Sequence, residues 1–409
     1  MRERPAVVLG TLVIAYGAFY LCRSNVESSF PLLQGAFGFS KAKLGYLSSA
    51  SIVAYAVGKV LMGMLGDVIG GKRLMLLAMT GSVLATLAFA ASGQFGLFVL
   101  FASVNRFFQS GGWSGAVHVV ARRFERPRHG FVMGVMSTSY ELGNVFALLL
   151  CSRITALLPG WRPLFLVNPL LLAAATIFLA LMLGEGPFAG TDRARQNASA
   201  QESADVQLVP ILASLAKRPA FWVVVSLSVL LTFLRVAFIT WTTLYLYEVS
   251  HFQDIAGAIA KTATFSAAGV LAALSVGTLS DRLGPGRRAP LMAASLAVVV
   301  ALVLVLARGA VHTPGAAAAI VGGIGFFLLG PYSLLAGALA LDVSDKGGAA
   351  TAAGIIDGAG YAGASLAGVT LGTLSETRGW AATFSAMAAV ALVATLVSAS
   401  WSVAALRRA

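Results

Sequence analysis

Charged residues stand inside the long apolar stretches of this 409-residue sequence. The first stretch contains "YGAFYLCRSNVE" (16–27), in which Arg23 and Glu27 follow two tyrosines. Such stretches are long enough to cross a bilayer, and a charge near its centre costs at least about 2.5 kcal/mol, so each of these residues predicts a functional role. The others of this kind are Lys59, Glu141, Arg235 and Asp357.

Tyrosines accompany four of these charges at helical spacing. In a helix that turns about 100° per residue, four side chains of the first stretch fall within about 60° of one another: Tyr16, Tyr20, Arg23 and Glu27. Tyr55 precedes Lys59 by four positions and Tyr361 follows Asp357 by four, so each of these pairs shares one helix face. The sequence therefore predicts polar stripes on otherwise apolar helices.

Such stripes suit the recognition of a compact anion. A guanidinium is always charged and offers a planar fork of donors that matches phosphate or carboxylate, whereas an ammonium acts as a point charge. We expect Arg23 and Arg235 to bind the anion from two helices and Lys59 to add charge. The hydroxyls of Tyr16, Tyr20 and Tyr55 would complete its hydrogen bonding.

The three acids complicate this interpretation, because three positive and three negative groups balance formally. Glu27 is either the intrahelical partner of Arg23, four residues away, or a sign that the substrate is not a simple phosphate ester. Glu141 is more readily explained as a partner of Lys59 or of an arginine than as a proton carrier. A zwitterionic substrate, or proton coupling through Glu141 or Asp357, therefore stays open.

The stretches themselves predict an all-α polytopic membrane protein. Hydrophobic residues make up 58% of the chain and charged residues 11%, against about 25% charged residues in soluble domains. Backbone groups inside a bilayer have no water to bond, so apolar stretches of about 20 residues should be helices. Twelve occur, near residues 6–33, 44–66, 73–93, 96–120, 130–151, 161–184, 220–247, 256–279, 289–307, 315–341, 349–373 and 380–404.

The formal net charge of +13 reflects membrane topology rather than nucleic-acid binding. If the N-terminus is cytoplasmic, most basic residues between the stretches fall on the cytoplasmic side, including the cluster "ARRFERPRHG" (121–130). This bias predicts that both termini are cytoplasmic. We expect a monomer in a bacterial-type inner membrane, with the lipid bilayer and a small anion as partners and no nucleic acid.

A polar segment divides the chain into two halves. Residues 186–219 form a predicted cytoplasmic linker between six-helix halves at 1–185 and 220–409. The halves look like repeats, since "GMLGDVIGGKR" (63–73) follows the second stretch and "GTLSDRLGPGRR" (277–288) follows the eighth. Arg235 follows Arg23 by nearly the same interval. Internal duplication of this kind is typical of a transporter.

These two loops resemble the loop motif of the major facilitator superfamily, whose members have twelve helices in two six-helix halves. In that family the glycines let neighbouring helices approach closely, and the aspartate latches one conformation by meeting a helix end and cationic partners. The resemblance implies conformational latch loops at two sets of residues: Gly63, Asp67, Gly70 and Arg73, and Gly277, Asp281, Gly284 and Arg287.

Two further sequences, "YGAFYLCRSN" and "AYAVGKVLMGMLGD", resemble the organophosphate:phosphate antiporter family, which includes glycerol-3-phosphate and hexose-phosphate transporters. In that family an arginine preceded by tyrosines, a lysine of the second helix and an arginine of the seventh surround the substrate phosphate. The resemblance implies these roles for six residues: Arg23, Lys59, Arg235, Tyr16, Tyr20 and Tyr55. The chain departs from the family in "QSGGWSG" (109–115), where both prolines of the helix-four motif are replaced.

Seven further polar or aromatic residues are candidates for a cavity wall, although helix packing would also explain them: Gln109, Trp113, His118, Tyr140, Trp241, Tyr332 and Tyr361. Arg106 lies near the end of its apolar stretch, where a long side chain can extend to the membrane surface. The sequence has no C-x-x-C or H-E-x-x-H pattern and no ATP-binding loop. We therefore expect no enzyme activity, metal or cofactor.

Together these features predict a secondary transporter that binds a phosphorylated organic anion between its halves and exchanges it for inorganic phosphate by alternating access. The alternative is a proton-coupled transporter of a carboxylate, zwitterion or drug-like solute that uses Glu141 or Asp357. A membrane receptor or scaffold with a transporter fold is a third interpretation. The organic part of the substrate is not specified by these residues.

Overall fold

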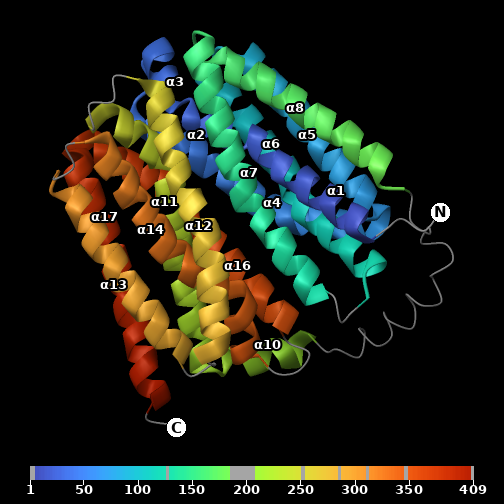
Figure 1. The fold of residues 1–409 in the computed structure, drawn as a ribbon, viewed down its shortest axis with the longest axis vertical. Helices are drawn as coiled ribbons and strands as arrows, with labels where there is room; N and C mark the ends of the chain where they lie inside the picture. Colours follow the sequence, from blue (N-terminus) through green and yellow to red (C-terminus); the bar gives the residue numbers. More distant parts are fainter. Residues whose placement is uncertain are drawn as a thin grey trace.

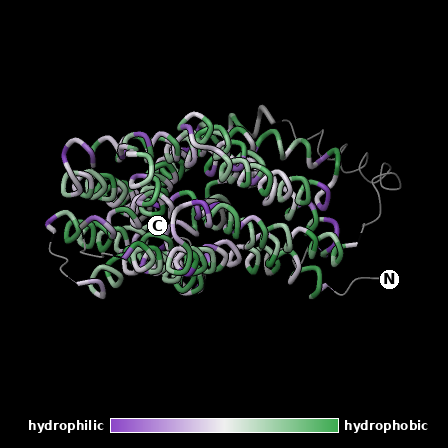
Figure 2. Tube along the Cα trace, turned by 90° about the horizontal axis from the view of Figure 1, so that it is seen from above, coloured by the Kyte–Doolittle hydropathy of each residue, from purple (hydrophilic) through white to green (hydrophobic). Residues whose placement is uncertain are grey.

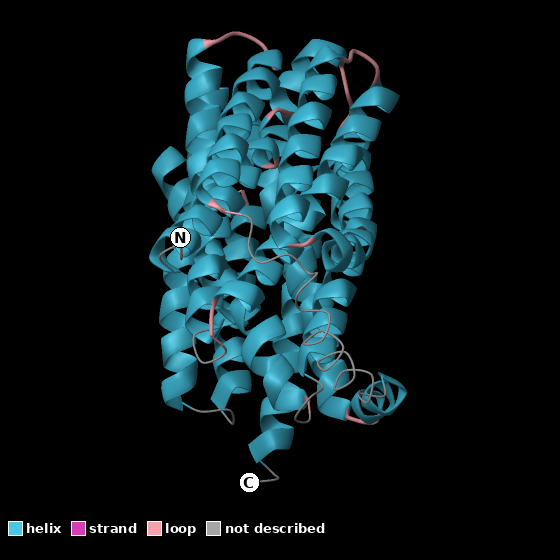
Figure 3. Ribbon diagram, turned by 90° about the vertical axis from the view of Figure 1, so that its right-hand side faces the viewer, coloured by secondary structure: helices cyan, strands magenta, loops and turns pink. Residues whose placement is uncertain are grey.

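The computed structural model describes residues 5–125, 129–184, 208–249, 254–283, 287–309, 313–344 and 349–406. Within these ranges every regular element is helical, and Figure 3 shows the helices packed side by side. The first half comprises α1 (Pro5–Ala18), the 3-10 helix η1 (Phe19–Cys22), α2 (Ser24–Ser28), α3 (Phe30–Phe37), α4 (Lys41–Ile69), α5 (Gly71–Ala91), α6 (Phe95–Arg123), α7 (His129–Leu157) and α8 (Arg162–Met182). After α10 (Leu208–Ala216), the second half comprises α11 (Pro219–Val249), α12 (Ile255–Leu283), α13 (Arg288–Ala307), α14 (Pro314–Leu334), the π-helix η4 (Leu335–Leu339), α15 (Ala340–Val343), α16 (Ala349–Ala364) and α17 (Ala367–Leu406).

The described chain provides twelve membrane crossings. Ten segments are long and apolar enough to span a bilayer, and the last, Thr351–Val403, contains two crossings because α17 breaks at Gly379. The φ angle there is +74°, a left-handed value that glycine adopts without strain. The remaining crossing is α6, which is too polar to join the ten, although its 29 residues extend about 43 Å. The prediction of twelve helices is confirmed.

The outer surface of the bundle is apolar. Figure 2 shows hydrophobic residues along most of the chain. On α8, for example, the side chains of Leu170, Ile177 and Leu181 are largely exposed. A large exposed apolar surface is suited to lipid rather than to water, as expected of a multi-pass membrane protein.

The two halves meet at one end of the bundle. We call it the far end; it holds the α3–α4, α5–α6 and α7–α8 connections, whereas the linker end holds α10 and both ends of the described chain. In Figure 1 the first half (blue to green) and the second (yellow to red) converge toward the far end and diverge toward the linker end. Residues 186–207 of the predicted linker lie outside the described ranges, so the domain boundaries stay a prediction.

Direct contacts between the halves close the far end. There α4 and α17 approach so closely that a Cβ atom on Gly45 would lie 2.2 Å from the backbone oxygen of Gly368. Only glycine permits two backbones to come this near. Beside them, Lys41 of α4 and Glu248 of α11 form an ion pair of 2.7 Å. Backbone packing and an ion pair thus hold the halves together at this end.

The first crossing is broken at Arg23. Helix α1 tightens into η1, Arg23 follows with φ −103°, and α2 begins at Ser24. The regular 3.6-residue periodicity that the sequence predicts for the whole stretch therefore does not hold beyond Ala18. The break also leaves backbone carbonyls that an unbroken helix would bond internally, and these need other donors.

Candidate functional site

A cavity of about 540 Å³ lies between the halves, within the usual size range of about 300 to 1,000 Å³ for small-molecule sites. All six residues predicted to bind the anion line it: Tyr16, Tyr20, Arg23, Tyr55, Lys59 and Arg235. Four of the seven other wall candidates do so as well: Trp113, Tyr140, Tyr332 and Tyr361. The cavity extends toward the linker end, since it includes Met133 near the start of α7 and Ser228 in the first third of α11.

Arg23 projects from the break in the first crossing. Its Nε donates to Gln109 Oε1 (2.9 Å), and one terminal nitrogen donates to the Tyr20 hydroxyl (3.3 Å). The guanidinium lies over the rings of Tyr20 and Tyr55, 4.9 and 4.8 Å from their centroids, where the ring faces attract a cation. Among the described residues, no carboxylate pairs with Arg23. Its charge is therefore available to an anion.

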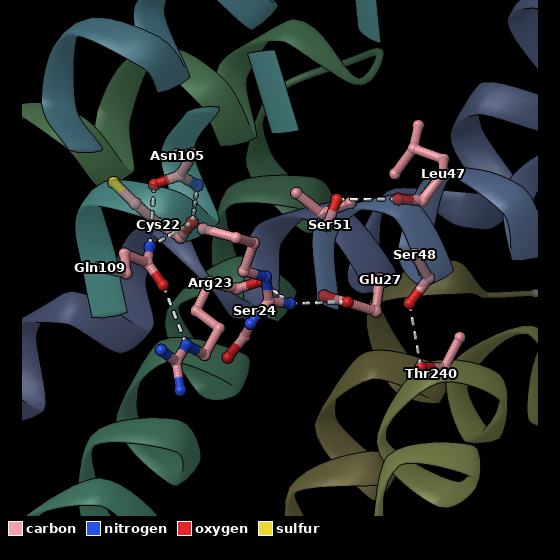
Figure 4. A network of polar contacts seen from close by, with 12 residues as sticks. Cys22, Arg23, Ser24, Glu27, Leu47, Ser48, Ser51, Asn105, Gln109 and Thr240 are labelled. Carbon is pink, nitrogen blue, oxygen red and sulfur yellow. Dashed lines mark hydrogen bonds and ion pairs between the residues drawn. The ribbon is translucent and has the colours of Figure 1, made fainter. Parts of the chain in front are cut away.

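Helix α6 holds the broken turn in place. Asn105 Nδ2 and Gln109 Nε2 both donate to the carbonyl of Cys22, at 2.6 and 3.1 Å. Figure 4 shows Gln109 between Asn105 and Arg23, so that one amide bonds both the freed backbone and the guanidinium. Both amides are almost fully buried and supply the donors that the broken helix lacks. Gln109, predicted to line the cavity, thus lies outside its wall and holds Arg23 in position.

Lys59 and Asp357 form an ion pair that joins α4 to α16 across the cavity. The ammonium lies 4.6 Å from the ring centroid of Tyr361 and 5.6 Å from that of Tyr55. The two charged side chains are 26% and 34% exposed, so the pair borders the open part of the cavity. The charge of Lys59 is already countered in this conformation.

Arg235 is buried on α11 and reaches across to the other half. One terminal nitrogen donates to Glu141 Oε1 of α7 (3.3 Å), so Glu141 is the partner of an arginine, as one of the two interpretations of this acid expected. The rings of Tyr332 and Tyr140 lie 5.1 and 5.7 Å from the guanidinium carbon. The Nε of Arg235 has no hydrogen-bond partner within the described ranges.

Arg106 changes the charge count of the site. The expectation that it extends to the membrane surface is wrong, because its Nη2 donates to Glu27 Oε1 (2.7 Å) inside the protein, where the two side chains are 12% and 6% exposed. Glu27 therefore pairs with Arg106 rather than with Arg23, since the helix break removes the geometry of residues four apart. Four cations and three carboxylates meet in the interior, and one net positive charge is left over.

Two of the remaining wall candidates lie away from the cavity. Trp241 packs near the far end against Phe30 and Trp380, with ring centroids 5.7 and 6.2 Å away. His118 lies near the linker end, where its Nε2 is 2.7 Å from Asp67 Oδ1. Over the described parts of the chain, no group of three or more His, Cys, Asp or Glu residues could hold a metal ion.

The first predicted latch loop lies wholly within the described ranges, whereas the second lies only partly within them. In the first, Gly70 ends α4 with φ +82°, and Asp67 contacts His118 of the same half. In the second, Gly284 lies outside the described ranges, whereas Arg287 directly precedes α13. A latching role for either loop stays a prediction.

The helical bundle with its cavity between two halves has a match among known protein families. The model of the Major Facilitator Superfamily matches residues 12–368. The chain belongs to the major facilitator superfamily. Its membership identifies a membrane transport protein and not an enzyme, and it agrees with the fold expected from the two loop motifs.

Three relatives within the superfamily match nearly the whole chain. It is 25% identical to the "Probable hexose phosphate transport protein" of Chlamydia trachomatis, over 95% of this chain and 88% of that protein. It is 24% identical to the "Glycerol-3-phosphate transporter" of Bacillus subtilis, over 93% and 88%. It is 26% identical to the "Membrane sensor protein UhpC" of Salmonella typhimurium, over 95% and 90%. The predicted resemblance to the organophosphate:phosphate antiporters is confirmed.

A solved structure shares the fold of this superfamily member. It is a bacterial homologue of the human lysosomal transporter Spinster, in an inward-facing and unoccupied conformation. The TM-score is 0.83 at 14% sequence identity, and the match covers 99% of this chain and 98% of the other. At this identity the likeness extends to the fold alone.

Proposed function

We propose that this protein is a secondary transporter that exchanges a phosphorylated organic anion for inorganic phosphate. Arg23 carries the proposal. It lines the cavity, and it is the only one of the four interior cations that has no carboxylate partner in the described part of the chain. A phosphate group presents two oxygens to a guanidinium fork, and its negative charge would offset the net positive charge of the site.

The relatives and the cavity wall support the choice of substrate. Two relatives are named for hexose phosphate and glycerol 3-phosphate, which share a phosphate group on a hydroxylated carbon chain. The hydroxyls of Tyr16, Tyr20 and Tyr55 can bond the phosphate, and the rings of Trp113 and Tyr332 offer apolar surface to the carbon chain. The wall therefore suits a small organic phosphate.

The ion pairs between the halves suit exchange. Lys59–Asp357 and Arg235–Glu141 each join one half to the other. An anion that binds Lys59 or Arg235 competes with these carboxylates, so binding loosens the contacts that hold this conformation. An empty carrier would stay tied by the ion pairs, and movement would require an anion in each direction.

The orientation of the protein completes the proposal. The excess of basic residues between the helices at the linker end favours a cytoplasmic linker end, with both termini on that side of a bacterial-type inner membrane. The cavity described above then faces the cytoplasm. We propose that a monomer carries out the exchange, because both halves of a single chain line the cavity.

The test is counterflow in proteoliposomes preloaded with labelled phosphate. External phosphate, glycerol 3-phosphate or a hexose phosphate should release the label, with or without a proton gradient, and the unphosphorylated sugars should not. Release that requires a proton gradient and is lost in Glu141→Gln would support the proton-coupled alternative. Binding of organic phosphates without any release would instead indicate a sensor, as one relative is named.

A further inference from the structure

We propose that Arg106 is a second anion-binding residue, which meets the substrate when the protein opens at the far end. This inference rests on the proposed function, because it concerns the same anion approaching from the other side of the membrane. Lys59 would have the corresponding role at the linker end.

A second, smaller chamber of about 60 Å³ lies beside Arg23. Five residues line both this chamber and the main cavity and so form the partition between them: Tyr20, Arg23, Tyr55, Arg235 and Tyr361. The chamber's other polar wall residues are Ser24, Glu27, Arg106, Asn144 and Thr240. A space with this lining is suited to water or a polar ligand, unlike the empty apolar voids of a protein core.

The directions of the helices place the chamber on the far-end side of the partition. Helix α4 runs from the far end to the linker end, and Ile52 of the chamber precedes Lys59 of the main cavity. Helix α11 runs the opposite way, and Thr240 of the chamber follows Ser228 of the main cavity. In Figure 4, Glu27 lies on the side of Arg23 that faces the contact between Ser48 and Thr240.

Alternating access would convert the chamber into an open vestibule. In this mechanism the halves rock around a fixed site, so the end that is closed here opens and the main cavity closes. The contacts between the chamber and the far surface include the Lys41–Glu248 ion pair and the Gly45–Gly368 approach. Once they separate, an anion entering from the far end reaches the chamber, and Arg106, before the main cavity.

Each side of Arg23 carries one cation held by one carboxylate. Lys59 is held by Asp357 on the linker side, and Arg106 is held by Glu27 on the far side. Glu27 binds Arg106 through one oxygen, and its Oε2 has no partner among the residues described, although the side chain is buried. Because only one hydrogen bond joins the two side chains, an oxyanion can replace the carboxylate as the partner of the guanidinium.

Arg235 adds a donor at the partition. Its Nε is buried and has no hydrogen-bond partner in the described ranges, and the residue lines both spaces. A phosphate oxygen at the partition would satisfy this donor. The anion would thus contact Arg23 and Arg235 in both conformations. It would contact Lys59 when the linker end is open and Arg106 when the far end is open.

The experiment measures self-exchange of labelled inorganic phosphate from each face, in right-side-out and inverted membrane vesicles. Glu27→Gln releases Arg106 from its carboxylate and should lower the KM for phosphate at the far-end face. The double variant E27Q/R106Q removes the cation as well without leaving an unpaired carboxylate. It should raise that KM at least about tenfold above the value for Glu27→Gln, as expected for one lost charge-assisted hydrogen bond.

The matched control is the pair on the other side of Arg23. Asp357→Asn and the double variant K59Q/D357N should show the same two shifts at the opposite face of the membrane. The two sets of variants should therefore change the KM for phosphate at opposite faces, and this comparison holds whichever face is cytoplasmic. Equal thermal unfolding temperatures of each double variant and its single variant check that the protein folds.

Two results would overturn the inference. If E27Q/R106Q changes the KM equally at both faces, or at neither, Arg106 has no side-specific role while the proposed function stands. If wild-type vesicles show no phosphate exchange at either face, the proposed function fails and the inference with it.

Discussion

Among individual side chains, Arg23 differs from the other interior cations in the groups that hold it. An amide oxygen, a hydroxyl and two tyrosine rings surround its guanidinium, and all are neutral. Neutral partners fix the direction of the fork without cancelling its charge. Lys59, Arg106 and Arg235 instead face carboxylates.

Replacement of Arg23 by lysine tests whether the planar fork matters in addition to the positive charge. Arg23→Lys keeps the positive charge but loses the planar fork, so kcat/KM for phosphate exchange should fall at least about tenfold. Initial rates in proteoliposomes measure this effect. Arg162→Lys is the matched control, because Arg162 lies over Trp161 outside the cavity wall. Normal exchange by Arg23→Lys would contradict the assignment.

The members of the site could be predicted from sequence, but their pairing could not. A charge inside an apolar stretch is costly and therefore conspicuous, which is why Arg23, Lys59 and Arg235 could be selected. Which carboxylate meets which cation depends on contacts between helices far apart in the chain. The expectation that Arg106 extends to the membrane surface is wrong because the residue lies well inside the stretch 96–120 and its partner, Glu27, belongs to another helix.

Among the helices, the break in the first crossing is supported by another element. The carbonyl of Cys22 accepts hydrogen bonds from Asn105 and Gln109 of α6, and Arg23 extends from the same turn. The helix ranges agree closely with the apolar stretches because bilayer thickness sets their length. The break could not be predicted from them, since its stabilising bonds come from another part of the chain.

Removal of the Gln109 amide tests this support. Gln109→Leu deprives the Cys22 carbonyl of one donor and Arg23 of its acceptor, which should lower stability by about 1 to 3 kcal/mol and raise the KM for phosphate. Thermal unfolding in detergent and exchange rates measure the two effects. Gln94→Leu, an exposed position just before α6, should change neither. If the two variants behave alike, α6 does not position Arg23.

Across the whole molecule, the far end is closed by backbone contact as well as by charge. A methyl group at Gly45 has no room while Gly368 faces it, whereas Gly35 on α3 has open space around the same position. Packing this close holds the halves in one relative orientation and is lost when they separate. The conformational balance should therefore depend on the size of residue 45.

Gly45→Ala should shift the protein toward opening at the far end. Spin labels at exposed positions 94 and 377, one in each half, report the separation of the halves there. Double electron–electron resonance should show a longer distance between the labels in Gly45→Ala than in the wild type. The Gly35→Ala control should match the wild type, and an unchanged distance in Gly45→Ala would show that the contact does not govern closure.

Helix α6 decides whether an odd or an even number of crossings separates the two copies of the glycine-aspartate loop. Asn105, Arg106 and Gln109 make this helix too polar to count as a crossing by apolarity, yet it spans the bundle, packed against α4 and α5. Without it, five crossings would separate the two copies of the glycine-aspartate loop, and the copies would face opposite compartments. With it there are six, both copies face the same compartment, and the duplication of the chain is preserved. Asn105 and Gln109, which hold the turn at Arg23 in place, therefore also make the fourth crossing hard to recognise from apolarity.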